Sequence, residues 1–108
     1  MDDVKIALKG LLKAEEYEEL NFLEEKPYKA PADFLLIIGL KNPPEGKMPF
    51  IHLYKDDIYY RGQLFNLDLT NGEKYPISTH IRAPGAVELM KNLIPTLQSV
   101  IQESLRLK

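Results

Sequence analysis

The chain has 108 residues, a formal net charge of −2 and no cysteine. This length predicts a single domain over residues 1–108, large enough to bury a core without metals or disulfides. The lack of cysteine excludes disulfides, thiolate catalysis and cysteine-ligated zinc, and the acidic balance disfavours nucleic acid as a partner because such binding relies on a basic surface.

The N-terminal region predicts a helix over residues 4–14. Asp2 or Asp3 can cap it, and its apolar side chains recur near one face. The acidic run at 15–19, continued at 24–25, is typical of a solvated helix face. Whether residues 17–24 extend the helix or form an additional strand stays open, because Leu20 and Phe22 alternate with polar residues.

Residues 34–40 are apolar at consecutive positions and predict a central strand that is buried on both faces. Each side of the sheet should then be covered. This apolar run is much shorter than the roughly 20 residues of a membrane span. The N-terminus also lacks a basic segment followed by an apolar one. We therefore expect a soluble cytoplasmic protein that makes no membrane contact.

The first hairpin is predicted over residues 50–61, with Asp56 and Asp57 at its tip. A two-residue turn would place Ile51, Leu53, Ile58 and Tyr60 on one face of the sheet. The opposite face would carry Phe50, His52, Tyr54, Tyr59 and Arg61. In this register Tyr54 lies opposite Tyr59, and His52 lies opposite Arg61.

The second hairpin is predicted over residues 64–80, where Asn71 and Gly72 mark the turn. A two-residue loop would put the apolar residues of its strands on opposite faces. A three-residue loop with Gly72 in the left-handed region instead pairs Phe65 with Ile77 and Leu67 with Tyr75. We choose the three-residue loop because it gives one coherent apolar face. Pro76 cannot donate a ladder hydrogen bond, so its strand should be an edge.

The last 25 residues predict a long helix whose first turn contains Pro84. Apolar side chains at helical spacing follow: Val87, Met90, Ile94, Leu97, Ile101 and Leu105. Pro95 lies inside this pattern, and we expect it to kink the helix at residues 91–95. The far end of the stripe, with Val100, Ile101 and Leu105, could instead protrude and pack against a second copy of the chain.

Together these elements predict an α+β fold. An antiparallel sheet of about five strands, with its central strand at 34–40 and hairpins at 50–61 and 64–80, would be flanked by the N-terminal helix and the kinked C-terminal helix. The C-terminal helix should cover the face with Ile51 and Leu53, together with Phe65, Leu67, Tyr75 and Ile77. The N-terminal helix could cover part of the other face.

The sequence contains no phosphate-binding, dinucleotide-binding, zinc-protease, serine-hydrolase or EF-hand motif. His52 and His80 lack a carboxylate placed to complete a metal site, so we predict neither metal nor cofactor. The candidate site is therefore the face that carries Phe50, His52, Tyr54, Tyr59 and Arg61, since tyrosine and arginine are enriched in interface hot spots. The simpler reading is that these tyrosines pack beneath the N-terminal helix.

Two classes of function remain. The first is a non-enzymatic protein-interaction domain that self-associates or is a subunit of a larger assembly. The second is a small-ligand-binding protein or an enzyme. In the enzyme, His52 would act as general acid or base, Arg61 would hold an anion and Tyr59 would donate a hydrogen bond. The enzyme hypothesis depends on the predicted adjacency of His52 and Arg61.

Overall fold

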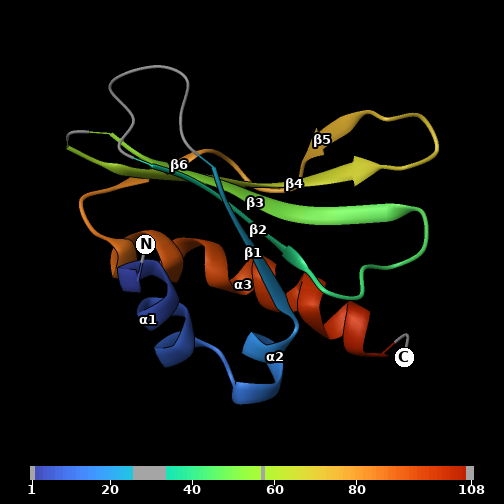
Figure 1. Ribbon diagram of the computed structural model, residues 1–108, viewed down its shortest axis with the longest axis horizontal. Helices are drawn as coiled ribbons and strands as arrows, with labels where there is room; N and C mark the ends of the chain where they lie inside the picture. The colour runs from blue at the N-terminus through green and yellow to red at the C-terminus, as the bar shows by residue number, and fades with distance from the viewer. Residues whose placement is uncertain (1, 26–33, 57, 107–108) are drawn as a thin grey trace.

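The computed structural model describes residues 2–25, 34–56 and 58–106. These residues form three helices and six strands, coloured in chain order in Figure 1. The elements are α1 (Asp2–Leu11), α2 (Ala14–Glu18), β1 (Leu20–Glu25), β2 (Phe34–Leu40), β3 (Lys47–Lys55), β4 (Tyr60–Asp68), β5 (Lys74–Pro76), β6 (Ile81–Ala83) and α3 (Ala86–Arg106).

The six strands form one antiparallel sheet, in which β1 to β5 are neighbours in chain order and β6 also pairs with β4. The short strands β5 and β6 both pair with the same edge of β4, at its two ends. Between them, the Leu64 amide donates a hydrogen bond to the Ser78 hydroxyl, 2.9 Å away. Figure 1 shows all three helices on one side of this sheet. The fold therefore has two layers, and helices cover one face of the sheet.

The α+β class, the N-terminal helix, the antiparallel sheet and the long C-terminal helix are confirmed. The sequence does not decide between helix and strand for residues 17–24. In the structure the short helix α2 ends within this segment, and the edge strand β1 follows it. The prediction that helices cover both sides of the sheet is wrong. α1 packs beside α3 in the same layer. The Asp3 carboxylate of α1 also contacts the sheet, because it accepts a hydrogen bond from the Tyr60 hydroxyl of β4.

The core lies between the sheet and the helices, and alternate residues of the central strands enter it. Leu36 and Ile38 of β2, Ile51 and Leu53 of β3, and Leu64 of β4 are at most 1% exposed. The side chains of α1 and α3 that complete this core include Val4, Leu8, Leu89, Met90, Leu93, Leu97 and Ile101. This alternation is the period of two expected of a sheet that is buried on one face.

α3 continues as a helix through Pro95, whose ring is exposed. The kink near this proline stays a prediction. Of the three residues proposed for self-association, Ile101 is fully buried, and Val100 and Leu105 are half-buried against the core. None of the helices in the described ranges is both long and apolar enough to span a bilayer.

The acidic run at 15–19 is only partly a solvated face, because Glu16 is 2% and Glu19 is 6% exposed. The Glu16 carboxylate accepts hydrogen bonds from the Lys13 amide at 2.9 Å and from the side-chain amides of Gln98 and Gln102. Burial opposes ionisation, but these hydrogen bonds outweigh it and lower the pKa of Glu16. Glu16 therefore joins α2 to the far half of α3.

The register predicted for the second hairpin is wrong by one residue. Phe65 pairs with Pro76 and Leu67 pairs with Lys74, so Leu67 and Tyr75 point to opposite faces. The loop contains four residues, 69–72, and it closes through the Asp68 amide and the Glu73 carbonyl. Gly72 adopts the expected left-handed conformation, with φ of 73°. Tyr75 and Ile77 remain 44% and 42% exposed, so core burial does not fix this register.

Two glycines on opposite faces of the sheet differ in what surrounds them. A Cβ atom added to Gly62 would lie 3.2 Å from a Leu93 methyl group and 3.5 Å from a Leu89 methyl group. At Gly39, the nearest heavy atom to an added Cβ would be the Pro49 carbonyl oxygen, at 3.9 Å. Gly62 therefore allows the close approach of α3 to β4, whereas Gly39 lies beside open space.

We predict that Gly62→Val lowers the free energy of unfolding by about 1–3 kcal/mol, because the buried side chains of α3 would have to move. Gly39→Val should leave it unchanged or raise it slightly, because valine favours strands and meets no close neighbour. Urea denaturation of the two variants measures the difference. Equal losses would contradict the assignment of the two faces.

Candidate functional site

The side of the sheet that faces away from the helices is here called the open face. Its described side chains follow from the strand register, and most are half-buried by their neighbours in the sheet. No helix of the described residues lies against it (Figure 1). Its central members are Leu23, Ile37, Met48, Phe50, His52, Tyr54, Arg61, Gln63, Phe65 and Leu67.

Four of the five predicted site residues lie on the open face. Phe50, His52 and Tyr54 come from β3, and Arg61 comes from β4. The α1 helix does not cover these residues, so the reading in which it packs over the tyrosines is wrong. Tyr59 instead lies in the loop before β4.

The pairing within the first hairpin also differs from the prediction. Tyr54 lies opposite Arg61, and His52 lies opposite Gln63. The connection has four residues, 56–59, instead of two. Because this shifts the register by two positions, each residue of the paired strands keeps its predicted face. Ile58, which was assigned to the core, lies in the loop and is 70% exposed. The enzyme hypothesis required His52 to lie directly opposite Arg61, and this prediction is therefore wrong.

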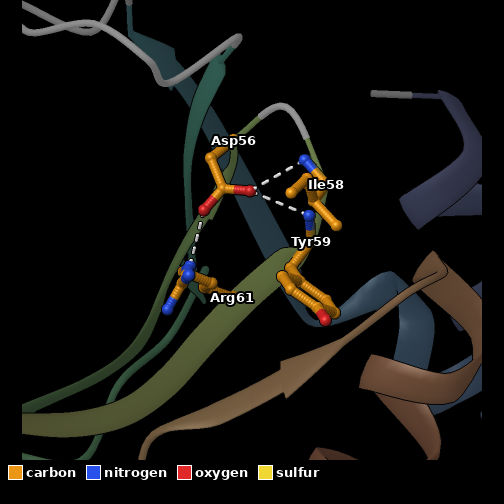
Figure 2. Close-up of polar contacts among 4 residues, drawn as sticks. All are labelled: Asp56, Ile58, Tyr59 and Arg61. Atoms are coloured by element: carbon orange, nitrogen blue, oxygen red, sulfur yellow. Dashed lines mark hydrogen bonds and ion pairs between the residues drawn. The ribbon is translucent and has the colours of Figure 1, made fainter.

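The Asp56 carboxylate organises this loop, as Figure 2 shows. One oxygen accepts hydrogen bonds from the amides of Ile58 at 3.0 Å and Tyr59 at 2.8 Å. The other accepts a hydrogen bond from Arg61 Nε at 2.7 Å. An aspartate that satisfies two loop amides favours the longer connection, in the same way that aspartate stabilises other turns.

These contacts determine the ionisation of Asp56. The hydrogen bond from the Tyr59 amide, followed by those from Arg61 and Ile58, lowers the pKa of Asp56 to about 2. The same ion pair raises the pKa of Arg61. Asp56 is consequently ionised throughout the neutral and mildly acidic range, and it orients the Arg61 side chain along the open face.

Aromatic and cationic side chains form rows across the open face. The Phe50 and Phe65 rings stack with centroids 5.7 Å apart, and Lys74 Nζ lies 4.4 Å from the Phe65 centroid. The centroid of the Tyr54 ring lies 6.0 Å from that of His52 and 6.4 Å from that of His80. Such rings place a large contact area at the surface of the sheet.

A hollow of about 360 Å³ lies in the open face at Gly39, where a side chain is missing from the row that contains Phe50. Its lining is mostly apolar and consists of Asn21, Leu23, Ile37, Gly39, Leu40, Met48, Phe50 and Leu67. Leu23 and Met48 are 51% and 40% exposed at its rim. Sequence reasoning missed this hollow, because it needs β1 beside β2 and Leu67 on the same face as Phe50.

Comparison of the chain with protein-family models, with curated proteins and with solved structures gave no match. The site must therefore be interpreted from its own chemistry. Within residues 2–25, 34–56 and 58–106, no group of three or more histidine, aspartate or glutamate side chains is arranged to hold a metal ion. The open face instead combines an apolar hollow with aromatic and cationic neighbours.

We predict that the Asp56 carboxyl titrates with a midpoint near pH 2, and that Arg61→Gln moves this midpoint part of the way toward 3.8. The shift should be incomplete because the Tyr59 and Ile58 amides still donate to the carboxylate. Since the pKa is lower in the folded state, the stability due to ionised Asp56 is present above pH 4 and is lost as the pH falls toward 2. Carboxyl ¹³C chemical shifts measure the midpoint, and an unchanged value in the variant would contradict the role of Arg61.

Proposed function

We propose that this protein is a non-enzymatic cytoplasmic interaction domain that acts as a subunit of a larger assembly and binds a protein partner on its open face. The observation that carries the proposal is the apolar hollow at Gly39, on a sheet face against which no described helix packs. Exposed apolar surface that is concave and flanked by aromatic rings is typical of protein-binding sites.

The hollow suits one apolar side chain of a partner. Leu23, Ile37 and Leu67 supply an aliphatic wall, and Phe50 supplies an aromatic one. Burial of apolar area yields roughly 25 cal/mol per Å², so one well-fitted anchor can dominate the affinity. We therefore assign the hollow as the place where this apolar side chain of the partner binds. The half-buried residues around the hollow would then exclude water from the contact.

A small-molecule ligand has weaker support than a protein partner. Small-ligand pockets combine apolar walls with several converging polar groups that fix the orientation of the ligand. In this hollow, Asn21 is the polar side chain among the lining residues. One amide can orient a ligand only loosely, whereas a protein partner gains specificity from the whole face.

We predict that a partner peptide loses affinity when the hollow is filled. Random dodecapeptides displayed on phage would be selected on the native protein, and the enriched sequence would be synthesised for fluorescence anisotropy. Gly39→Val should weaken its binding by about tenfold, or 1.4 kcal/mol, because the added methyl groups occupy the anchor position.

The matched control for that experiment is Ile6→Asp. Ile6 is an apolar residue that is 69% exposed, but it lies on α1 in the helical layer. Its substitution should leave the peptide affinity unchanged. Failure to enrich any sequence, or equal losses in both variants, would refute binding at the open face.

Self-association gives a separate prediction. With a different protein as the partner, the chain should sediment as a monomer at micromolar concentration. A dimer that Gly39→Val dissociates would instead assign the open face to a second copy of this chain. Sedimentation velocity of the native protein and both variants decides between these partners.

A further inference from the structure

Two arginines face each other across the edge of the sheet. Arg61 of β4 and Arg82 of β6 are direct cross-strand partners, so their side chains emerge on the same face. Both guanidinium groups lie near the ring of Tyr59, with Cζ atoms 5.9 Å and 4.6 Å from its centroid. Like charges in directly opposite positions destabilise a sheet. The Asp56 carboxylate offsets this repulsion at Arg61, and an anion bound between the two guanidinium groups would offset it further.

The contacts of the two side chains leave donors for such an anion. Asp56 engages Nε of Arg61, and Figure 2 shows one nitrogen of this guanidinium directed away from the carboxylate. Arg82 is exposed, and among the described residues its guanidinium group lies over the Tyr59 ring. Asp56 and Tyr59 thus hold the two guanidinium groups in place before any ligand binds, which reduces the entropic cost of binding.

We propose that Arg61 and Arg82 bind a carboxylate of an acidic peptide segment of the partner. Guanidinium groups bind carboxylates through paired, charge-assisted hydrogen bonds. This inference rests on the proposed function, because it names the chemistry of the partner that occupies the open face. The apolar anchor would enter the hollow at Gly39, and the acidic residue would reach the arginine pair.

The sheet register sets the distance between these two points. Gly39 lies opposite Phe50, and Arg61 lies opposite Tyr54, four residues farther along β3. Gly39 is on β2 and Arg61 is on β4, so the two residues are also two strand spacings apart. Standard strand dimensions then give a distance of about 16 Å between them. An extended peptide covers this distance in about five residues. The partner segment should therefore carry an acidic residue about five positions from its apolar anchor.

An acidic peptide fits the open face better than a nucleic acid does. Nonspecific binding of a single strand requires a continuous basic groove with stacking rings. Here the arginine pair and Lys74 lie near different parts of the face, and the region between β1 and β4 is lined mainly by Leu23, Ile37 and Leu67. The chain also has a net charge of −2.

The direct test is a titration with acetyl-tetraglutamate amide, followed through the side-chain Nε–H signals of the arginines by ¹⁵N NMR. The peptide should shift the Arg61 and Arg82 signals saturably, while acetyl-tetraglutamine amide should not. Arg82→Gln should weaken the binding at least fivefold. The matched control, Arg106→Gln, removes an exposed arginine at the end of α3 and should leave the binding unchanged.

Equal responses to the glutamate and glutamine peptides, or equal losses in the two variants, would overturn the inference. Tighter binding of octadeoxythymidylate at the same signals would overturn it in favour of a nucleic acid. If selected peptides depend on Gly39 but carry no acid and ignore Arg82→Gln, the inference fails while the proposed function stands. If tetraglutamate binds the arginine pair but no peptide uses the hollow, the proposed function fails and the carboxylate site remains.

Discussion

Packing of α3 across β4 and β6 buries one set of alternate strand residues. This one-sided burial determines which side chains lie on the open face. Ile51, Leu53 and Leu64 enter the core beneath α3. The period of two then requires the residues between them to lie on the open face. Phe50, His52 and Tyr54 therefore lie on the face that the helices leave uncovered, where their neighbours in the sheet half-bury them. Gly62 contributes to this arrangement by letting the leucines of α3 approach the sheet closely.

The sequence predicts the parts of the fold where burial and spacing agree. The central strand 34–40 and the long C-terminal helix follow from continuous or periodic apolar residues, and both are present. The paired residues of the first hairpin keep their predicted faces, because a shift by two positions preserves the alternation. Ile58 and Tyr59 do not, because they lie in a loop that is two residues longer than predicted. The Asp56 carboxylate explains the longer loop, and side-chain bonds of this kind are difficult to deduce from a turn dipeptide alone.

The second hairpin shows where such reasoning fails. The predicted register assumed that Phe65, Leu67, Tyr75 and Ile77 must share a buried face. In the structure none of them is fully buried, and β4 continues without a break from Tyr60 to Asp68. Phe65 and Leu67 consequently join Phe50 on the open face. The sequence does not predict the hollow or the arginine pair, for a related reason. The hollow requires β1 beside β2, the arginine pair requires β6 beside β4, and local patterns do not specify these strand pairings.

The interrupted edge beside β4 has a consequence for assembly. A long unpaired strand edge can template the addition of strands from other molecules, which leads to aggregation. Here that edge is divided into β5 and β6, each three residues long, and Pro76 lacks an amide donor. Ser78 fills the gap between them through its hydrogen bond with Leu64. This boundary therefore offers few consecutive backbone groups to an added strand and resists strand-by-strand polymerisation.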